Sequence, residues 1–95
     1  MTPSVSAEAD RELSEGAIYY AQEGDNSLGL AFITEFERAL NFLCLHPQIG
    51  ALWRNNRRRF SLRRFPYSII YYVRDGELRV VALAHQRQRP GYWTE

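Results

Sequence analysis

The sequence has no lysine, so all twelve of its basic residues are arginine. Cysteine occurs once, at Cys44, which excludes an internal disulfide and suits a reducing compartment. The longest apolar runs, such as Ile69–Val73, are five residues long, whereas a membrane-spanning helix needs about 18–20. The first residues have neither a basic start nor an apolar stretch, which argues against a signal peptide. We therefore expect a cytoplasmic protein with no membrane segment.

The bulk composition is that of an ordinary folded protein. The 95 residues are 45% hydrophobic, 24% charged and 14% aromatic, which excludes a disordered chain. A chain of this length supports one modest hydrophobic core and leaves little room for a closed cofactor cavity. We expect a single domain over residues 1–95.

The net charge of +1 hides a strong asymmetry along the chain. Residues 1–50 carry eight acids and two arginines, a net −6, and residues 51–95 carry ten arginines and three acids, a net +7. Two interpretations stay open. The arginines are either a solvated surface or a basic face for an anionic partner, which would be nucleic acid or an acidic protein segment.

The first half of the chain has the periodicity of two helices. Ser6 is a suitable cap, and apolar residues then recur at helical spacing, which predicts a helix over residues 7–23. A polar break follows, and the next apolar stripe predicts a helix over residues 27–46, closed by His46-Pro47. Two helices joined by a short turn predict an antiparallel hairpin.

The second half changes to the alternation of strands. Phe60 and Leu62 alternate with polar residues, and Pro66 ends that strand. Asp75-Gly76 is a hairpin signal between the strand 67–74 and the return strand 78–85. Tyr71 and Tyr72 must point to opposite faces, so one is core. The pattern predicts an α+β fold.

Taken in order, these blocks resemble the RelE/ParE superfamily of toxins, which includes proteins known for plasmid stabilisation. The resemblance covers nearly the whole chain and is carried by Ala9-Asp10 with Leu13, Phe36-Glu37 through Leu43, His46-Pro47 with Ile49-Gly50, residues 62–67 running into 70–73, and residues 84–93. It implies an N-terminal antiparallel helix hairpin packed on a three- to four-stranded antiparallel sheet. Because only Pro3-Ser4-Val5 precedes the cap, the family's first strand is expected to be short or missing.

The resemblance implies a growth-inhibiting toxin of a type II toxin–antitoxin module, neutralised by a separate antitoxin. In this family the antitoxin makes the DNA contacts, so we expect no direct DNA binding by this chain. The target is left open. His85-Gln86-Arg87 looks more like the ParE mode, in which the toxin binds DNA gyrase without catalysis. The alternatives are a metal-independent, ribosome-dependent mRNA endoribonuclease of the RelE kind and an inactive interaction module.

The candidate site residues follow from these alternatives. A ribonuclease needs cations for the charged transition state and groups that transfer protons, and by position the candidates are Arg63, Arg64, His85, Arg87 and Tyr92. Candidates for binding the antitoxin or target are Arg57, Arg58, Arg59, Arg87, Arg89, Tyr92 and Trp93. His85 has the alternative of a plain strand-end residue, and Tyr92 and Trp93 that of a lid over the core.

No cofactor or metal is expected. Cys44 and His46 are two potential metal ligands, and two ligands next to a proline make a poor cage. Cys44 stands in an apolar run, where a buried thiol is unreactive.

Overall fold

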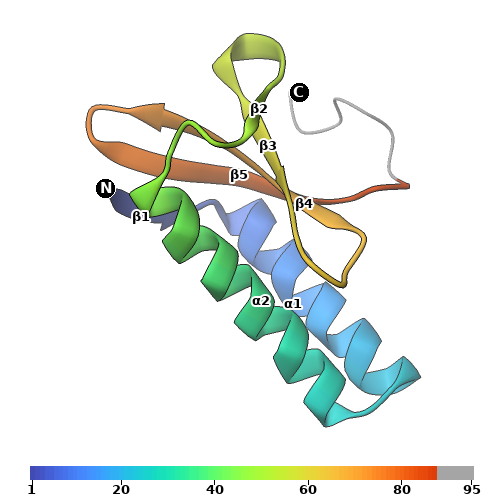
Figure 1. The fold of residues 1–95 in the computed structure, drawn as a ribbon. Coiled ribbons are helices and arrows are strands. Elements are labelled where there is room, and N and C mark those ends of the chain that lie inside the picture. The colour runs from blue at the N-terminus through green and yellow to red at the C-terminus, as the bar shows by residue number, and fades with distance from the viewer. Residues whose placement is uncertain (88–95) are drawn as a thin grey trace.

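The computed structural model describes residues 1–87 and shows two helices packed on one face of a five-stranded sheet (Figure 1). The helices are α1 (Ala7–Glu23) and α2 (Asn26–Leu45). The strands lie in the order β1-β5-β4-β3-β2 and comprise β1 (Thr2–Val5), β2 (Ala51–Leu52), β3 (Arg58–Ser61), β4 (Tyr67–Arg74) and β5 (Glu77–His85). The predicted α+β class and the N-terminal helix hairpin are confirmed.

Both helices begin at side-chain caps. The hydroxyl of Ser6 accepts a hydrogen bond from the Ala9 N–H, and the carboxylate of Asp25 accepts one from the Leu28 N–H. The predicted bounds of α1 are confirmed, and α2 begins and ends one residue before its predicted bounds. The helices approach closely at Gly29, where a Cβ would lie 2.7 Å from the carbonyl oxygen of Ala17.

The sheet is built on the β4–β5 hairpin. Its turn places Asp75 and Gly76 at positive φ, 51° and 77°, as the Asp-Gly pair predicts. The expected sheet differs in two respects. The first strand is present and short, but it pairs parallel to β5 rather than antiparallel, and β2 adds a fifth strand that meets β3 at two residue pairs. The sheet is therefore mixed.

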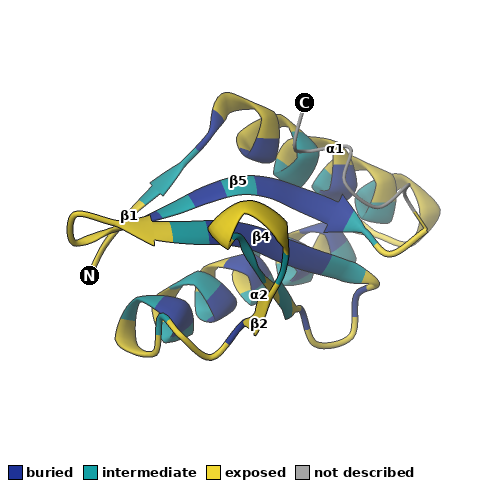
Figure 2. Ribbon diagram, turned by 90° about the horizontal axis from the view of Figure 1, so that it is seen from above, coloured by how far each residue is buried: buried dark blue, intermediate teal, exposed yellow. Residues whose placement is uncertain are grey.

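The two faces of the sheet are buried unequally. The helix face carries Ile69, Tyr71 and Leu83, which join Phe32 and Leu43 in the main core. Among residues 1–87, the opposite face has a smaller buried cluster made of Ile70, Ala82 and Ala84, with Val81 against it. Figure 2 shows the buried residues concentrated along β4 and β5, with exposed residues on the loop between β2 and β3. No helix in residues 1–87 is long and apolar enough to cross a membrane.

Candidate functional site

The β2–β3 hairpin, residues 51–61, carries the predicted Arg57-Arg58-Arg59 run. A short 3-10 turn, η1 (Arg54–Asn56), connects its strands, and Asn55 and Asn56 both have positive φ, 57° and 61°. Figure 1 shows this hairpin rising from the sheet on the side away from the helices. The turn places several arginines on a projecting loop.

Arg57 and Arg59 lie against aromatic rings. The guanidinium of Arg57 is 4.7 Å from the ring centre of Tyr72, and that of Arg59 is 5.8 Å from the ring of Trp53. Arg54 lies over the same Trp53 ring at 5.7 Å. Since Arg59 pairs with Ile70 across the strands, it belongs to the sheet face opposite the helices. These contacts orient the guanidinium groups.

Arg58, the middle arginine of the run, lies on the other face and braces the backbone. Its guanidinium donates hydrogen bonds to the carbonyls of Gln48 and Gly50, at 3.0 and 2.8 Å. The hydroxyl of Tyr71 donates to the Pro47 carbonyl at 2.7 Å and accepts from the Gly50 N–H at 3.1 Å. Arg58 therefore supports the loop before β2, and its role in binding an antitoxin or target stays a prediction.

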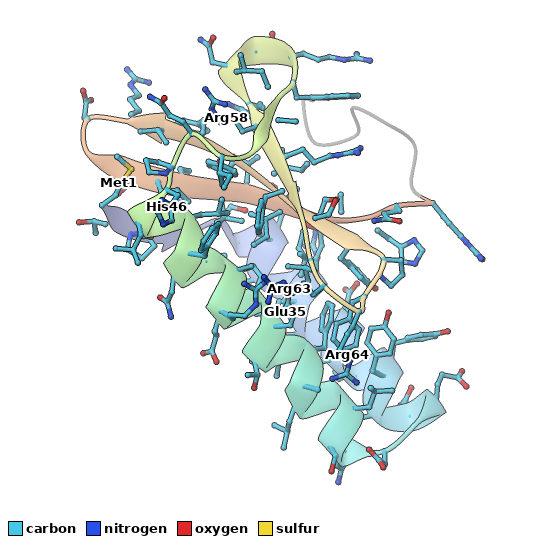
Figure 3. All side chains as sticks on the ribbon, in the orientation of Figure 1. Met1, Glu35, His46, Arg58, Arg63 and Arg64 are labelled. Carbon is cyan, nitrogen blue, oxygen red and sulfur yellow. The ribbon has the colours of Figure 1, made fainter. Side chains whose placement is uncertain are left out.

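Arg63 and Arg64 lie in the turn between β3 and β4, beside α2 (Figure 3). The backbone N–H of Arg63 donates to the carboxylate of Glu35 at 2.7 Å, and Arg38 donates two hydrogen bonds to the same carboxylate. These bonds, led by Arg38, lower the pKa of Glu35. Arg64 has a φ of 70° and lies over the ring of Phe65. The hydrogen bonds of Glu35 therefore hold the turn between β3 and β4 against α2.

His85 and Arg87 line a separate hollow, which we call the tyrosine groove. It has a volume of about 490 Å³ and lies between α1 and the paired ends of β4 and β5. Its lining residues are Tyr19, Tyr20, Pro66, Tyr67, His85 and Arg87. The ring of Tyr67 meets those of His85 and Tyr20 edge-on, at centre distances of 5.0 and 6.4 Å. As far as residues 1–87 show, the groove is an aromatic surface with Arg87 exposed at its edge.

The groove does not activate Tyr20 or Tyr67 as a base. Burial raises the pKa of Tyr67, and the neighbouring Tyr20, Tyr19, Glu12 and Glu15 raise it further. Burial likewise raises the pKa of Tyr20. The Nδ1 atom of His85 accepts a hydrogen bond from the Arg87 N–H at 3.0 Å, which fixes the orientation of the imidazole ring. Neither tyrosine is prepared to act as a base near neutral pH.

The structure therefore divides the predicted site residues among three places. Arg64 lines a hollow at the start of α2 with Gly24, Asp25, Ser27, Leu28 and Ala31, whereas His85 and Arg87 line the tyrosine groove. Arg57 and Arg59 lie on the β2–β3 hairpin. Three further predicted residues, Arg89, Tyr92 and Trp93, lie outside the described residues.

Sequence reasoning missed the tyrosines of the groove and the aromatic partner of the hairpin arginines. Tyr20 shares the apolar spacing of the first helix, which indicates core packing rather than a groove, and the neighbouring Tyr19 is 54% exposed. Trp53, next to Arg54 and close to the arginine run, was the available signal for arginine–aromatic stacking. No group of three potential ligands in residues 1–87 is placed to hold a metal ion.

Comparisons with known proteins agree with the architecture. A family model described as "ParE toxin of type II toxin-antitoxin system, parDE" matches residues 4–90. Among solved structures, a chain of the "Chromosomal ParDE TA system from P. aeruginosa" superposes with a TM-score of 0.80, covering 90% of this chain and 95% of that one at 16% identity. The comparison with curated proteins found no match. The family match spans nearly the whole sequence, so this chain belongs to the ParE toxin family of type II toxin–antitoxin systems.

Proposed function

We propose that this chain acts in the ParE manner, as a cytoplasmic toxin that binds and inhibits DNA gyrase and is neutralised by a cognate antitoxin. The observation that carries the proposal is the family match over residues 4–90. The residues of the described chain add an argument about the target, because two arginines predicted for a ribonuclease, Arg64 and Arg87, line separate hollows.

A ribonuclease of the RelE kind is the second candidate, and the groove chemistry favours it less. Cleavage needs a base for the 2′-hydroxyl and a cation beside the scissile phosphate. Burial raises the pKa of Tyr67 in the tyrosine groove, and nearby groups that include Glu12 and Glu15 raise it further, which disfavours the phenolate that a base requires. Those carboxylates would also repel a phosphate. Binding to a protein target requires neither a base nor a phosphate-binding cation in the groove.

An antitoxin has an exposed apolar surface to cover. On the outer side of the helix hairpin, a shallow hollow of about 370 Å³ is lined by small and apolar residues that include Ala17, Ile18, Leu30 and Ile33. Ile18 and Leu30 are 56% and 64% exposed. Exposed apolar side chains gathered in one place are typical of interaction surfaces.

The deciding experiment is induced expression of the chain without an antitoxin. Inhibition of gyrase predicts growth arrest, a DNA-damage response and loss of supercoiling activity in an assay with purified gyrase. Codon-linked cuts in mRNA with normal supercoiling would instead establish the ribonuclease. Normal growth and no effect on either target would make the chain an inactive interaction module.

Arg87 gives this experiment a site-specific arm. Arg87 is exposed at the rim of the tyrosine groove. Arg87→Ala should therefore raise the inducer dose needed to arrest growth at least tenfold, without lowering the amount of folded protein. Arg11→Ala, which removes an exposed arginine from α1, is the matched control and should leave toxicity unchanged. If Arg87→Ala kept full toxicity, the groove rim would not be the inhibitory surface.

A further inference from the structure

The β2–β3 hairpin is the centre of an acid-free part of the chain. Residues 39–74 contain seven arginines and no aspartate or glutamate. The ion pairs of residues 1–87 involve Arg11, Arg38 and Arg74, and none involves Arg54, Arg57 or Arg59. The positive charge of the hairpin is therefore not neutralised by a carboxylate within the described chain, and it is available to an anionic partner.

The hairpin arginines are also held in place before any partner arrives. Arg54 and Arg59 lie over the ring of Trp53, and Arg57 lies over that of Tyr72. A guanidinium that rests on an aromatic ring keeps the hydrogen-bond donors of its edge available. It also loses less side-chain freedom when it binds. The stacking orients charge toward the outside of the hairpin.

Arg57 borders a hollow of about 470 Å³ lined by Asn55, Asn56, Arg57, Tyr72, Val73 and Arg74. The hollow therefore offers two guanidinium groups and two amides. Arg74 approaches Asp75 at 3.8 Å, but both side chains are more than three-quarters exposed, and such pairs contribute little. The buried Nε–H of Arg57 has no hydrogen-bond acceptor in residues 1–87. This is a concave, electropositive surface lined by side-chain donors.

We propose that the β2–β3 hairpin binds the phosphate backbone of duplex DNA through Arg54, Arg57 and Arg59. Duplex DNA is favoured among polyanions because its charges are dense and rigidly spaced, about one per 1.7 Å of axis. Proteins that bind single strands present free aromatic faces for the bases, whereas Trp53 and Tyr72 already carry guanidinium groups. The inference goes beyond gyrase binding, and it departs from the expectation that only the antitoxin contacts DNA.

The test is fluorescence anisotropy with the purified chain and three labelled probes: a 20-base-pair duplex, one of its single strands and a decaglutamate peptide. The duplex should bind most tightly near 50 mM salt, with affinity falling as salt rises. Each phosphate contact contributes about −0.9 to the slope of log affinity against log salt. Arg54→Gln/Arg59→Gln, which changes two exposed residues, should therefore make the slope shallower by about 1.8.

A matched control changes two arginines away from the hairpin. Arg11→Gln/Arg64→Gln removes the same charge from exposed positions on α1 and in the β3–β4 turn, and it should leave the slope within about 0.5 of the original. Arg57→Lys/Arg59→Lys keeps the charge and should retain most of the binding. Circular dichroism establishes that each variant is folded, and Arg57→Gln alone replaces the double variant if that one unfolds.

Three results would overturn the proposal. The duplex could fail to bind at 50 mM salt. The single strand or the glutamate peptide could bind more tightly than the duplex and lose affinity in the hairpin variant. The control variant could lose as much affinity as the hairpin variant. None of these measurements contains gyrase, so their failure is distinguishable from a failure of gyrase inhibition.

Discussion

The helix side of the sheet and the β2–β3 hairpin use aromatic rings in opposite ways. On the helix side, Phe32 packs against Tyr20, Phe65 and Tyr67 at ring-centre distances of 4.8–5.2 Å. At the hairpin, the rings of Trp53 and of Tyr72 on the adjacent β4 carry guanidinium groups. Packing of ring on ring removes apolar surface from water and stabilises the fold. Packing of guanidinium on ring orients charge toward solvent. The comparison separates a region that stabilises the fold from one suited to recognition.

The largest change in stability is expected for Phe32→Ala. Phe32 is fully buried at the centre of the aromatic cluster, so its truncation should lower the free energy of unfolding by about 3–5 kcal/mol. Urea denaturation measures the change. Below the unfolding transition, DNA binding by the hairpin should stay the same.

Ile18→Ala is the control for that prediction. Ile18 is 56% exposed on α1, and its truncation should change the free energy of unfolding by no more than about 0.5 kcal/mol. A cost below about 1 kcal/mol for Phe32→Ala would mean that the aromatic cluster does not stabilise the fold as its packing indicates.

A middle-sized effect is expected where the two regions meet, at Tyr71. Its hydroxyl bonds to Pro47 and Gly50, and burial is the main reason why its pKa is raised. Tyr71→Phe leaves those two backbone groups without their partner, which should cost about 1–3 kcal/mol. Hydrogen exchange should speed up in residues 47–61 more than in α1.

Tyr72→Phe provides the matched comparison, because it removes the same atom from the neighbouring residue on the other face. Its ring stays under Arg57, so stability and exchange should both stay near those of the original chain. Equal effects of the two variants would show that the Tyr71 hydroxyl is not what anchors the hairpin.

The regular elements were predictable because local signals specify them. Ser6 marks the start of α1, and Asp75-Gly76 marks the β4–β5 turn. β1 was expected only as a short or missing strand, since its partner β5 is some 75 residues away and no local pattern reports a parallel pairing. β2 has two residues, too few for a period to be visible.

The candidate site was predictable in residue type and not in arrangement. A run of three arginines in a strand must alternate between faces, but the sequence does not tell which one turns inward. The structure places Arg58 against the backbone of Gln48 and Gly50 and leaves Arg57 and Arg59 on aromatic rings. The tyrosine groove likewise depends on α1 meeting the ends of β4 and β5, a tertiary contact that no local spacing encodes.

The smallest effect on stability is expected at Glu35, whose carboxylate connects α2 to the turn between β3 and β4. Arg38 and the Arg63 N–H hold the pKa of its carboxyl below the ordinary value of 4.5. Because the pKa is lower in the folded chain than in the unfolded one, the carboxylate stabilises the fold above the unfolded pKa. That stabilisation is lost as the pH falls through the folded pKa.

Glu35→Gln should therefore cost about 1 kcal/mol at pH 7 and less as the pH approaches 3, because the neutral side chain keeps weaker hydrogen bonds. Urea denaturation at several pH values between 3 and 7 measures this, with Glu37→Gln, an exposed neighbour on α2, as the control. If the stability of Glu35→Gln varied with pH as that of the original chain does, the hydrogen bonds of Glu35 with Arg38 and Arg63 would not contribute to stability. If it also weakened DNA binding by the hairpin, the two regions would be energetically coupled through this turn, contrary to the separation drawn from their packing.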